Sequence, residues 1–320
     1  MCVFCNQRYI SGVEEYNRDE ARKVIEEVLS EIEGKGYEAE IAFFGGSFTG
    51  IDRSLMISLL DMAEAYVEKG LVSGIRMSTR PDYISKDIID ILDRYTVNAV
   101  ELGIQSLDDE VLKASKRGHT ADDSKKAIGM LKDAGYVTVG QMMIGLPHST
   151  REKEIRCAEE ICKWGVSGTR IYPTIVFKGT ELSEMMTVGK YTPLTLEDAV
   201  MRSADVYEVF LRNKVDCLRI GLCDSDVIHS EECYSAGPNH PSIGELVYSE
   251  IYFRRISGLI KKLNCYGKNI TVSVPSSDVS MAVGQHHGNR DRLISLFGLN
   301  GIKFVKSECT KRFDVSVTVD

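Results

Sequence analysis

The 320-residue sequence lacks any apolar run long enough to cross a bilayer, and it lacks an excess of basic residues. A membrane-spanning helix takes roughly 18 consecutive apolar residues, and no run here approaches that length. Met1 is not followed by the charged and then apolar region of a secretion signal. Lys and Arg total 39 against 47 Asp and Glu, a net charge of −8, which disfavours a basic nucleic-acid-binding protein. We therefore expect a cytoplasmic protein without a membrane partner.

Internal repeats, low-complexity segments and the signs of a disulfide framework are also missing. The nine cysteines are an odd number, and most are expected to be buried thiols. Cys2 and Cys5 stand apart, because the Cys2-Val3-Phe4-Cys5 motif lies at the extreme N-terminus, where no core explains it. Taken alone, the motif fits half of a zinc site, a redox pair or no site at all. No second Cys-x-x-Cys completes a zinc site.

Apolar periodicity alternates between helix and strand over residues 19–175. Strands are expected at 41–44, 74–78, 99–104, 136–144 and 169–175, and helices at 19–33, 55–67, 85–92, 120–133 and 149–164. Ser85 and Thr120 are expected to cap two of these helices. Such alternation is typical of a parallel sheet with helices outside it, in a barrel or an open sheet.

Beyond Thr195 the pattern changes. A helix to about Arg212 is followed by a strand at 216–222, a polar stretch at 223–241 and a helix at 243–263. Further strands are expected at 269–274 and 313–319, with a helix at 290–297 between them. We assign residues 1–200 to the barrel and residues 201–320 to a small α+β module.

The carboxyl ends of the expected parallel strands are glycine-rich or polar. Ligands bind at these ends in parallel α/β folds. Seven segments of the sequence, in this order, resemble those of the radical S-adenosylmethionine (SAM) superfamily, in particular the group of the Elongator catalytic subunit, with oxygen-independent coproporphyrinogen oxidases as more distant relatives. The segments are 2–7, 43–48, 78–83, 100–106, 117–120, 142–147 and 170–174.

The resemblance implies a partial (β/α)6 TIM-like barrel with a [4Fe–4S] cluster and SAM as cofactors. Such enzymes cleave SAM reductively to a 5′-deoxyadenosyl radical, which abstracts hydrogen from a substrate. Cys2 and Cys5 match the last two ligands of the family's Cys-x3-Cys-x2-Cys motif, and Phe4 matches the aromatic residue beside the cluster. The resemblance further implies SAM contacts at the following residues: Gly45, Gly46 and Ser47 at the methionine amino group, Ser78 and Gln141 at the ribose, Gln105 at a strand end, and Arg117 at the carboxylate.

Three of these features also fit plain structural roles. Gly45-Gly46 could be an ordinary turn, and Gln105 and Gln141 could be satisfied polar groups inside the barrel. Glu101, within an apolar strand, is expected to be a barrel-interior group or a partner of Arg80 or Arg117. The segments 145–147 and 172–174 are expected at the rim. No role is assigned to His119.

The sequence departs from the family pattern at both ends. The family's first cluster cysteine would lie four residues before Cys2, and the first barrel strand would precede it. We interpret this as truncation, with a degenerate member as the other reading, and expect this chain to hold a cluster poorly. Because the sequence ends at Asp320, we do not expect it to carry the acetyltransferase domain of the Elongator subunit.

Several functional alternatives remain open. The substrate is a small molecule or a tRNA, and an electron donor such as ferredoxin or flavodoxin would be needed. The alternative to a radical SAM enzyme is a non-catalytic barrel that binds SAM or a nucleotide, or a zinc protein.

Overall fold

A computed structural model describes residues 2–5, 17–222, 233–308 and 311–320. Residues 6 and 7 of the segment 2–7 lie outside these ranges, as do residues 223–232 of the polar stretch. The chain divides into two compact units, with residues 1–194 and 209–239 in unit 1 and residues 195–208 and 240–320 in unit 2. None of the helices in the described ranges is long and apolar enough to cross a membrane.

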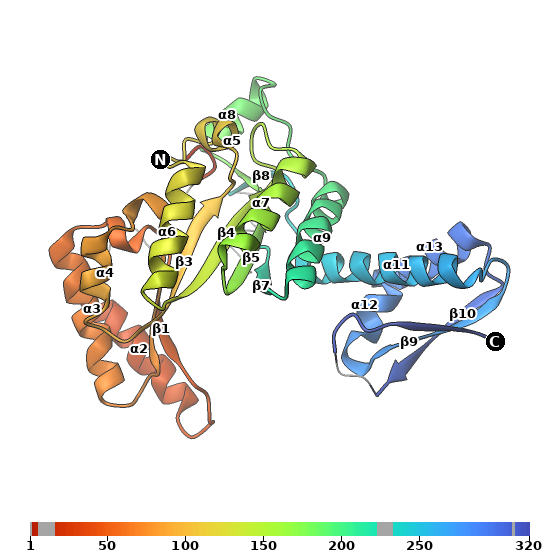
Figure 1. Ribbon diagram of the computed structural model, residues 1–320, viewed down its shortest axis with the longest axis horizontal. Helices are drawn as coiled ribbons and strands as arrows, with labels where there is room; N and C mark the ends of the chain where they lie inside the picture. Colours follow the sequence, from red (N-terminus) through yellow and green to blue (C-terminus); the bar gives the residue numbers. More distant parts are fainter. Residues whose placement is uncertain (1, 6–16, 223–232, 309–310) are drawn as a thin grey trace. The chain divides into compact units, whose positions relative to one another are not determined.

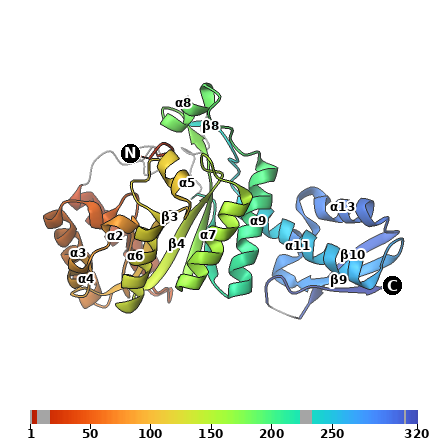
Figure 2. The same ribbon diagram turned by 45° about the horizontal axis from the view of Figure 1, so that its top comes forward.

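Unit 1 is built on a curled sheet of six parallel strands (Figures 1 and 2). In spatial order these are β1 (Glu40–Phe43), β2 (Gly74–Thr79), β3 (Val97–Gln105), β4 (Val137–Ile144), β5 (Gly168–Pro173) and β7 (Asp216–Ile220). The spatial order follows the chain order, so all carboxyl ends lie along one edge. This is the expected partial barrel, with β1 as one outer strand and β7 as the other in the described sheet.

Helices follow the strands in chain order. They are α2 (Arg18–Ile32), α3 (Arg53–Glu68), α4 (Lys86–Leu92), α5 (Asp109–Ala114), α6 (Ala121–Asp133), α7 (Arg151–Trp164), α8 (Glu181–Thr187) and α9 (Leu196–Asn213), with short 3-10 turns η1 (Phe48–Gly50) and η2 (Pro81–Tyr83). The Ser85 side chain accepts from Ile88 N, and Thr120 forms a capping box with Asp123, so both expected caps are confirmed. A two-stranded antiparallel ladder joins β6 (Val176–Phe177) to β8 (Tyr234–Ala236).

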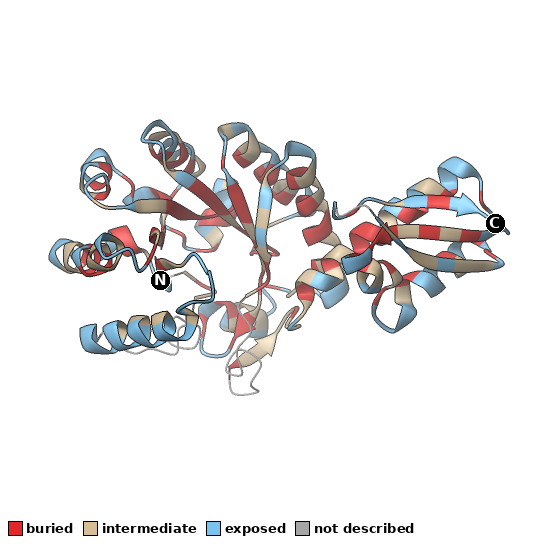
Figure 3. Cartoon of the chain, turned by 90° about the horizontal axis from the view of Figure 1, so that it is seen from below, coloured by how far each residue is buried: buried red, intermediate tan, exposed pale blue. Residues whose placement is uncertain are grey.

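The two faces of the sheet differ in chemistry. Met77, Leu102, Met142 and Ile171 are fully buried on one face, and the buried residues of the strands are red in Figure 3. Helices α3 and α6 contact the sheet at β2, β3 and β4. The alternate residues carry polar side chains into the lumen, the space enclosed by the concave face of the sheet. This alternation explains why the strands read as nearly continuous apolar runs with single polar residues among them.

Unit 2 packs the long helix α11 (Ile243–Leu263) with a three-stranded sheet in the order β10 (Gly301–Ser307), β9 (Asn269–Pro275), β11 (Ser316–Val319). Its remaining elements are η3 (Ser276–Asp278), α12 (Val279–Val283), η4 (Gln285–His287) and α13 (Gly288–Phe297). The buried Tyr252 hydroxyl donates to Asp278 Oδ2 at 2.6 Å and accepts from Phe313 N at 2.9 Å. These bonds tie α11 to the segments that flank β9 and β11.

Two expectations about the C-terminal segment need correction. The strand expected at 216–222 in the small module is β7, which pairs with β5 as the sixth strand of the barrel sheet. Its sequence misleads because the ladder is irregular between Thr169 and Arg170, and Leu218 stays 50% exposed. Strand β10 was not expected from the sequence, and β11 begins at Ser316 rather than 313.

Candidate active site

The Cys2–Cys5 turn is held at the carboxyl edge of the sheet by its own backbone and by Val3. Val3 N donates to Ser115 O at 3.2 Å, and Val3 O accepts from Leu182 N at 2.8 Å. The Val3 side chain is 1% exposed and packs with Val176, Leu182 and Tyr191, while Phe4 packs against the same cluster. Cys5 N donates to Cys2 O at 3.1 Å, which closes the turn. Both thiols are half-buried. They lie on a turn that the buried Val3 anchors.

Arg117 joins this turn to the end of β3. Its Nη1 donates to Cys2 Sγ at 3.3 Å, and its Nη2 donates to Gly103 O at 2.6 Å. The side chain is 7% exposed, and its Nε has no hydrogen-bond partner among the described residues. A buried guanidinium N–H without an acceptor is costly, so this atom is a candidate for a hydrogen bond to a ligand.

Gln105 lies beside Arg117, and Gln141 lies on the neighbouring strand β4. Gln105 adopts a left-handed backbone conformation (φ +64°), is 8% exposed, and its Oε1 has no partner in the described part of the chain. A Cβ atom added to Gly103 would lie 3.0 Å from Arg117 Nη2 and 3.1 Å from Gln105 Nε2. Gly103 pairs in register with Gln141. The structure thus brings Cys2, Gln105 and Arg117 together around Gly103, whose missing side chain leaves room for them, and Gln141 lies in register with this glycine on the next strand.

The other expected SAM contacts lie on the neighbouring strands of the same edge. The loop after β1 is tied to β2 because Thr49 Oγ1 lies 2.6 Å from Thr79 Oγ1 and donates to Tyr83 O at 3.0 Å. Above this anchor, Gly45 (φ +106°) and Gly46 are exposed, and a Cβ added to Gly46 would meet nothing within 4 Å. Ser47 precedes η1 and Ser78 is the penultimate residue of β2, both half-buried.

Glu101 is a barrel-interior group, as one of the two sequence interpretations held. Its carboxylate is fully buried and accepts from Arg170 Nε at 2.7 Å, Arg170 Nη2 at 2.9 Å and Gln141 Nε2 at 2.8 Å. Arg76 Nη1 lies at 3.5 Å. The expected partners Arg80 and Arg117 are wrong: Arg80 pairs with Asp82, and Arg117 bonds Cys2 and Gly103.

His119 is a residue of this site that sequence reasoning missed. It is 5% exposed, its Nε2 lies 3.1 Å from Ile104 O, and its Nδ1 has no partner among the described residues. Burial, and then the nearby Arg117 charge, lower the pKa of His119 to about 4. The ring is therefore neutral at pH 7 and donates to the carbonyl that precedes the left-handed Gln105. In the sequence, His119 belongs to the matching segment 117–120 just before a helix, and neither feature gave it a role.

The stability of the protein is expected to fall as pH drops from about 6.5 toward 4, in part because of His119. The unfolded state protonates this ring near pH 6.5 and the folded state only near pH 4. Between these values the unfolded state binds one more proton than the folded state, so lowering the pH favours unfolding. That proton is worth about 1.4 kcal/mol per pH unit. Urea unfolding at pH 7, 6 and 5 should show a shallower dependence in His119→Gln. An identical slope in both proteins would contradict the neutral, buried ring.

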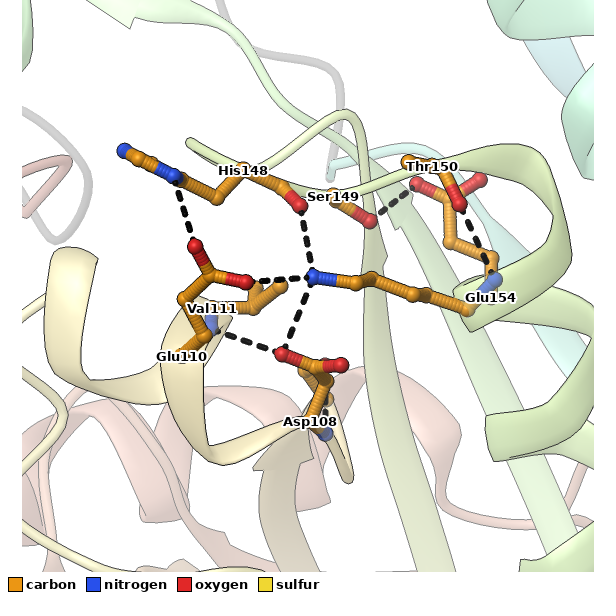
Figure 4. A network of polar contacts seen from close by, with 9 residues as sticks. Asp108, Glu110, Val111, His148, Ser149, Thr150 and Glu154 are labelled. Atoms are coloured by element: carbon orange, nitrogen blue, oxygen red, sulfur yellow. Dashed lines mark hydrogen bonds and ion pairs between the residues drawn. The ribbon is translucent and has the colours of Figure 1, made fainter.

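A network of polar contacts fixes the rim between β3 and β4 (Figure 4). Lys153 Nζ donates to Asp108 Oδ1 at 3.1 Å, Glu110 Oε2 at 3.0 Å and His148 O at 3.1 Å. The buried Glu154 accepts from Gly145 N at 2.7 Å. The segment 145–147, expected at the rim, therefore follows β4 as a braced loop.

Burial keeps three other thiols protonated at neutral pH. Burial raises the pKa of Cys157 to about 12 and those of Cys162 and Cys217 to about 11. Iodoacetamide at pH 8 is therefore expected to label Cys2 and Cys5 well before these three, because the thiolate is the reactive form. Peptide mapping over time checks the order, with a urea-unfolded sample as the reference for full labelling. Labelling of Cys157 at the rate of Cys2 would contradict the burial.

Comparison with known families decides the classification. The profile of the radical SAM superfamily matches residues 1–161, and that of the radical SAM C-terminal domain matches residues 166–252. The chain belongs to the radical SAM superfamily. Its radical SAM region is 35% identical over 137 residues to Elongator complex protein 3 of Saccharomyces cerevisiae, covering 41% of this chain and 25% of that protein.

Two archaeal comparisons extend this result. The tRNA uridine(34) acetyltransferase of Methanocaldococcus infernus is 38% identical over 127 residues, 39% of this chain and 24% of that protein. The solved structure of Elp3 from the same organism, with an N-terminal deletion, matches with a TM-score of 0.62 and 26% identity over 73% of this chain and 58% of that one. The chain spans about a quarter of the length of these first two relatives, the yeast protein and the acetyltransferase.

The radical SAM family implies a [4Fe–4S] cluster and SAM. The residues at the carboxyl edge of the sheet fit these two groups to different degrees. For SAM, unpartnered buried atoms of Gln105 and Arg117 and the open glycine loop after β1 fit a polar ligand. For the cluster, the turn supplies two thiols, which are suitable iron ligands. Within the described ranges no group of three or more Cys, His, Asp or Glu side chains could hold a metal ion. The described turn thus offers two thiols that match two of the three cysteines in the family motif.

Proposed function

We propose that this protein is a radical SAM enzyme that binds SAM at the carboxyl edge of the barrel sheet and uses it to initiate hydrogen abstraction from a substrate. The observation that carries the proposal is the grouping of Cys2, Gln105 and Arg117 around Gly103, with two buried polar atoms left unpartnered. Buried polar groups are almost always paired, so these atoms favour a site completed by a ligand.

Each residue takes a role that its chemistry permits. Cys2 and Cys5 would hold iron as thiolates, with Phe4 packed beside them. When bound, the cluster and SAM together supply a one-electron reduction that releases a 5′-deoxyadenosyl radical. Arg117 would bind the SAM carboxylate through its guanidinium. Gly45 and Gly46 would let the backbone approach the methionine amino group, with Ser47 beside them. Ser78 and Gln141 would contact the ribose of SAM. Gln105 would contact SAM from the end of β3.

The braced loops would keep this geometry while the reactive species is present. The Lys153 network and Glu154 hold the β3 and β4 loops, and the neutral His119 holds the end of β3. An electron donor such as ferredoxin or flavodoxin would be required. The cofactor supplies the difficult chemistry, and the protein positions it and excludes water.

We infer that a tRNA is the first substrate to test. Support comes from the relatives named as Elongator complex protein 3 and tRNA uridine(34) acetyltransferase, which are 35% and 38% identical in the radical SAM region. Binding of tRNA at rising salt concentrations, with a DNA duplex as control, tests this. Affinity that depends steeply on salt and favours tRNA supports it; equal binding of both, or none, points to a small-molecule substrate.

Metal content distinguishes the enzyme from the zinc alternative. After anaerobic reconstitution, iron with acid-labile sulfide supports the proposal, whereas stoichiometric zinc in the purified protein supports the zinc-binding reading. Equilibrium dialysis with labelled SAM should give one saturable site per chain. Absence of SAM binding, with or without metal, would overturn the proposed function.

A further inference from the structure

Side chains from four adjacent strands meet at one carboxylate inside the barrel. Glu101 on β3 accepts two hydrogen bonds from Arg170 on β5 and one from Gln141 on β4, and Arg76 on β2 lies at 3.5 Å. Arg76 is held in turn by Glu40 on β1, whose Oε2 accepts from its Nε at 2.9 Å. Burying a carboxylate costs free energy unless it is paired and hydrogen-bonded, and the two parallel bonds from Arg170 are the strongest that Glu101 accepts.

The carboxylate determines which way the Gln141 amide points. A carboxylate only accepts hydrogen bonds, so the amide NH₂ must be the end that faces Glu101, and the amide oxygen must face elsewhere. Within the described ranges no group donates to Gln141 Oε1, and the residue is half-buried in the lumen. Gln141 lies in register with Gly103, which places it in the same layer as Arg117 and Gln105.

We propose that Glu101 is a positioning residue that holds the Gln141 amide with its oxygen toward the ligand, where it accepts a hydrogen bond from a ribose hydroxyl of the bound nucleoside. This inference rests on the proposed function, because it takes the nucleoside to be that of SAM. Glu101 does not touch the ligand. By fixing the Gln141 amide, Glu101 makes the site select nucleosides with free ribose hydroxyls. A deoxyribose lacks the hydroxyl that would donate to the amide oxygen.

A purely structural Glu101 would behave differently. If the carboxylate only neutralised Arg170 and Arg76 within the barrel, a change at position 101 would weaken all ligands by the same factor. If it holds Gln141, the change reduces the preference for the hydroxylated ligand. The measured quantity is therefore the ratio of two dissociation constants, which cancels any general loss of binding or folding.

The experiment measures binding of S-adenosylhomocysteine and its 2′-deoxy and 3′-deoxy analogues by calorimetry. In the unaltered protein, one deoxy analogue is expected to bind about threefold to tenfold more weakly, the range of a single net hydrogen bond. Gln141→Ala should bring this ratio close to one. Glu101→Asp keeps a charge for Arg170 but withdraws the carboxylate from Gln141, and should bring the ratio close to that of Gln141→Ala.

Two further variants complete the test. Arg170→Lys disturbs the ion pair but leaves Glu101 facing Gln141, so its ratio should match the unaltered protein. The double change Glu101→Ala with Arg170→Ala removes both partners of the ion pair, so no unpaired charge stays buried. It replaces Glu101→Asp in the test if that variant does not fold. Its ratio should match Gln141→Ala.

The outcomes separate the inference from the proposed function. Loss of the hydroxyl preference in Glu101→Asp, with retention in Arg170→Lys, supports the positioning role. A preference that survives in Glu101→Asp, or no preference in the unaltered protein, overturns it while leaving SAM binding intact. Failure of the unaltered protein to bind any of the three ligands overturns the proposed function itself.

Discussion

Replacement of Arg117 by alanine is expected to weaken SAM binding by about tenfold to a hundredfold. The guanidinium is 7% exposed, bonds both Cys2 Sγ and Gly103 O, and has a buried Nε without a hydrogen-bond partner among the described residues. Hydrogen bonds to charged groups contribute about 1.5–3 kcal/mol each, which corresponds to the stated factor. Equilibrium dialysis with labelled SAM measures the loss directly.

Two controls make this result specific. Arg117→Lys keeps the charge but not the planar fork that bonds two partners at once, so it should recover only part of the affinity. Arg94→Ala removes an exposed arginine that precedes β3, at the opposite edge of the sheet, and should bind SAM normally. Thermal unfolding of each variant shows whether the fold is retained. Unchanged affinity in folded Arg117→Ala would contradict the placement of the SAM carboxylate.

The second large effect concerns iron. A leader of Cys-Gly-Gly placed before Met1 restores the Cys-x3-Cys-x2-Cys spacing with Cys2 and Cys5. This form is expected to take up about four irons and four sulfides per chain on anaerobic reconstitution, because three thiolates then face one cluster. Cys2→Ser or Cys5→Ser in the same form should lose most of that iron, and the double change nearly all of it.

Matched variants separate cluster ligation from incidental iron. A Ser-Gly-Gly leader has the same length without the thiol and should bind far less iron. Cys162→Ser alters a half-buried thiol on α7 and should leave the iron content unchanged. Iron uptake that is equal in Cys2→Ser, Cys5→Ser and Cys162→Ser would contradict the assignment of the Cys2–Cys5 turn.

The sequence was sufficient for the first five strands of the barrel sheet and the helices between them because their signals are local. Helix caps at Ser85 and Thr120 and the apolar strands between them follow from a few neighbouring residues each. The motif residues Cys2, Gln105 and Arg117 were identified by resemblance. In the structure Arg117 bonds both Cys2 Sγ and Gly103 O, and the Gln105 amide lies beside the same glycine. Their contacts with cofactors remain predictions.

What sequence reasoning missed depends on contacts between distant segments. Strand β7 pairs with β5, some 48 residues earlier (216 against 168), and its bulge and exposed Leu218 hide the pattern of a barrel strand. Glu101 was noticed as a carboxylate in an apolar strand, but its partner Arg170 is 69 residues away. His119 resembles an ordinary residue before a helix until its ring is seen to reach Ile104 O. Parallel sheets bring such residues together only after long crossovers.

The most direct test of the account is the formation of 5′-deoxyadenosine. The chain with the Cys-Gly-Gly leader is reconstituted anaerobically, reduced with dithionite and mixed with SAM, beside the same form carrying Arg117→Ala and beside the Ser-Gly-Gly form. The account predicts 5′-deoxyadenosine from the first protein, and at least tenfold less from the other two at subsaturating SAM. Iron-loaded protein that binds SAM but yields no 5′-deoxyadenosine would contradict it and would leave the barrel as a binding scaffold.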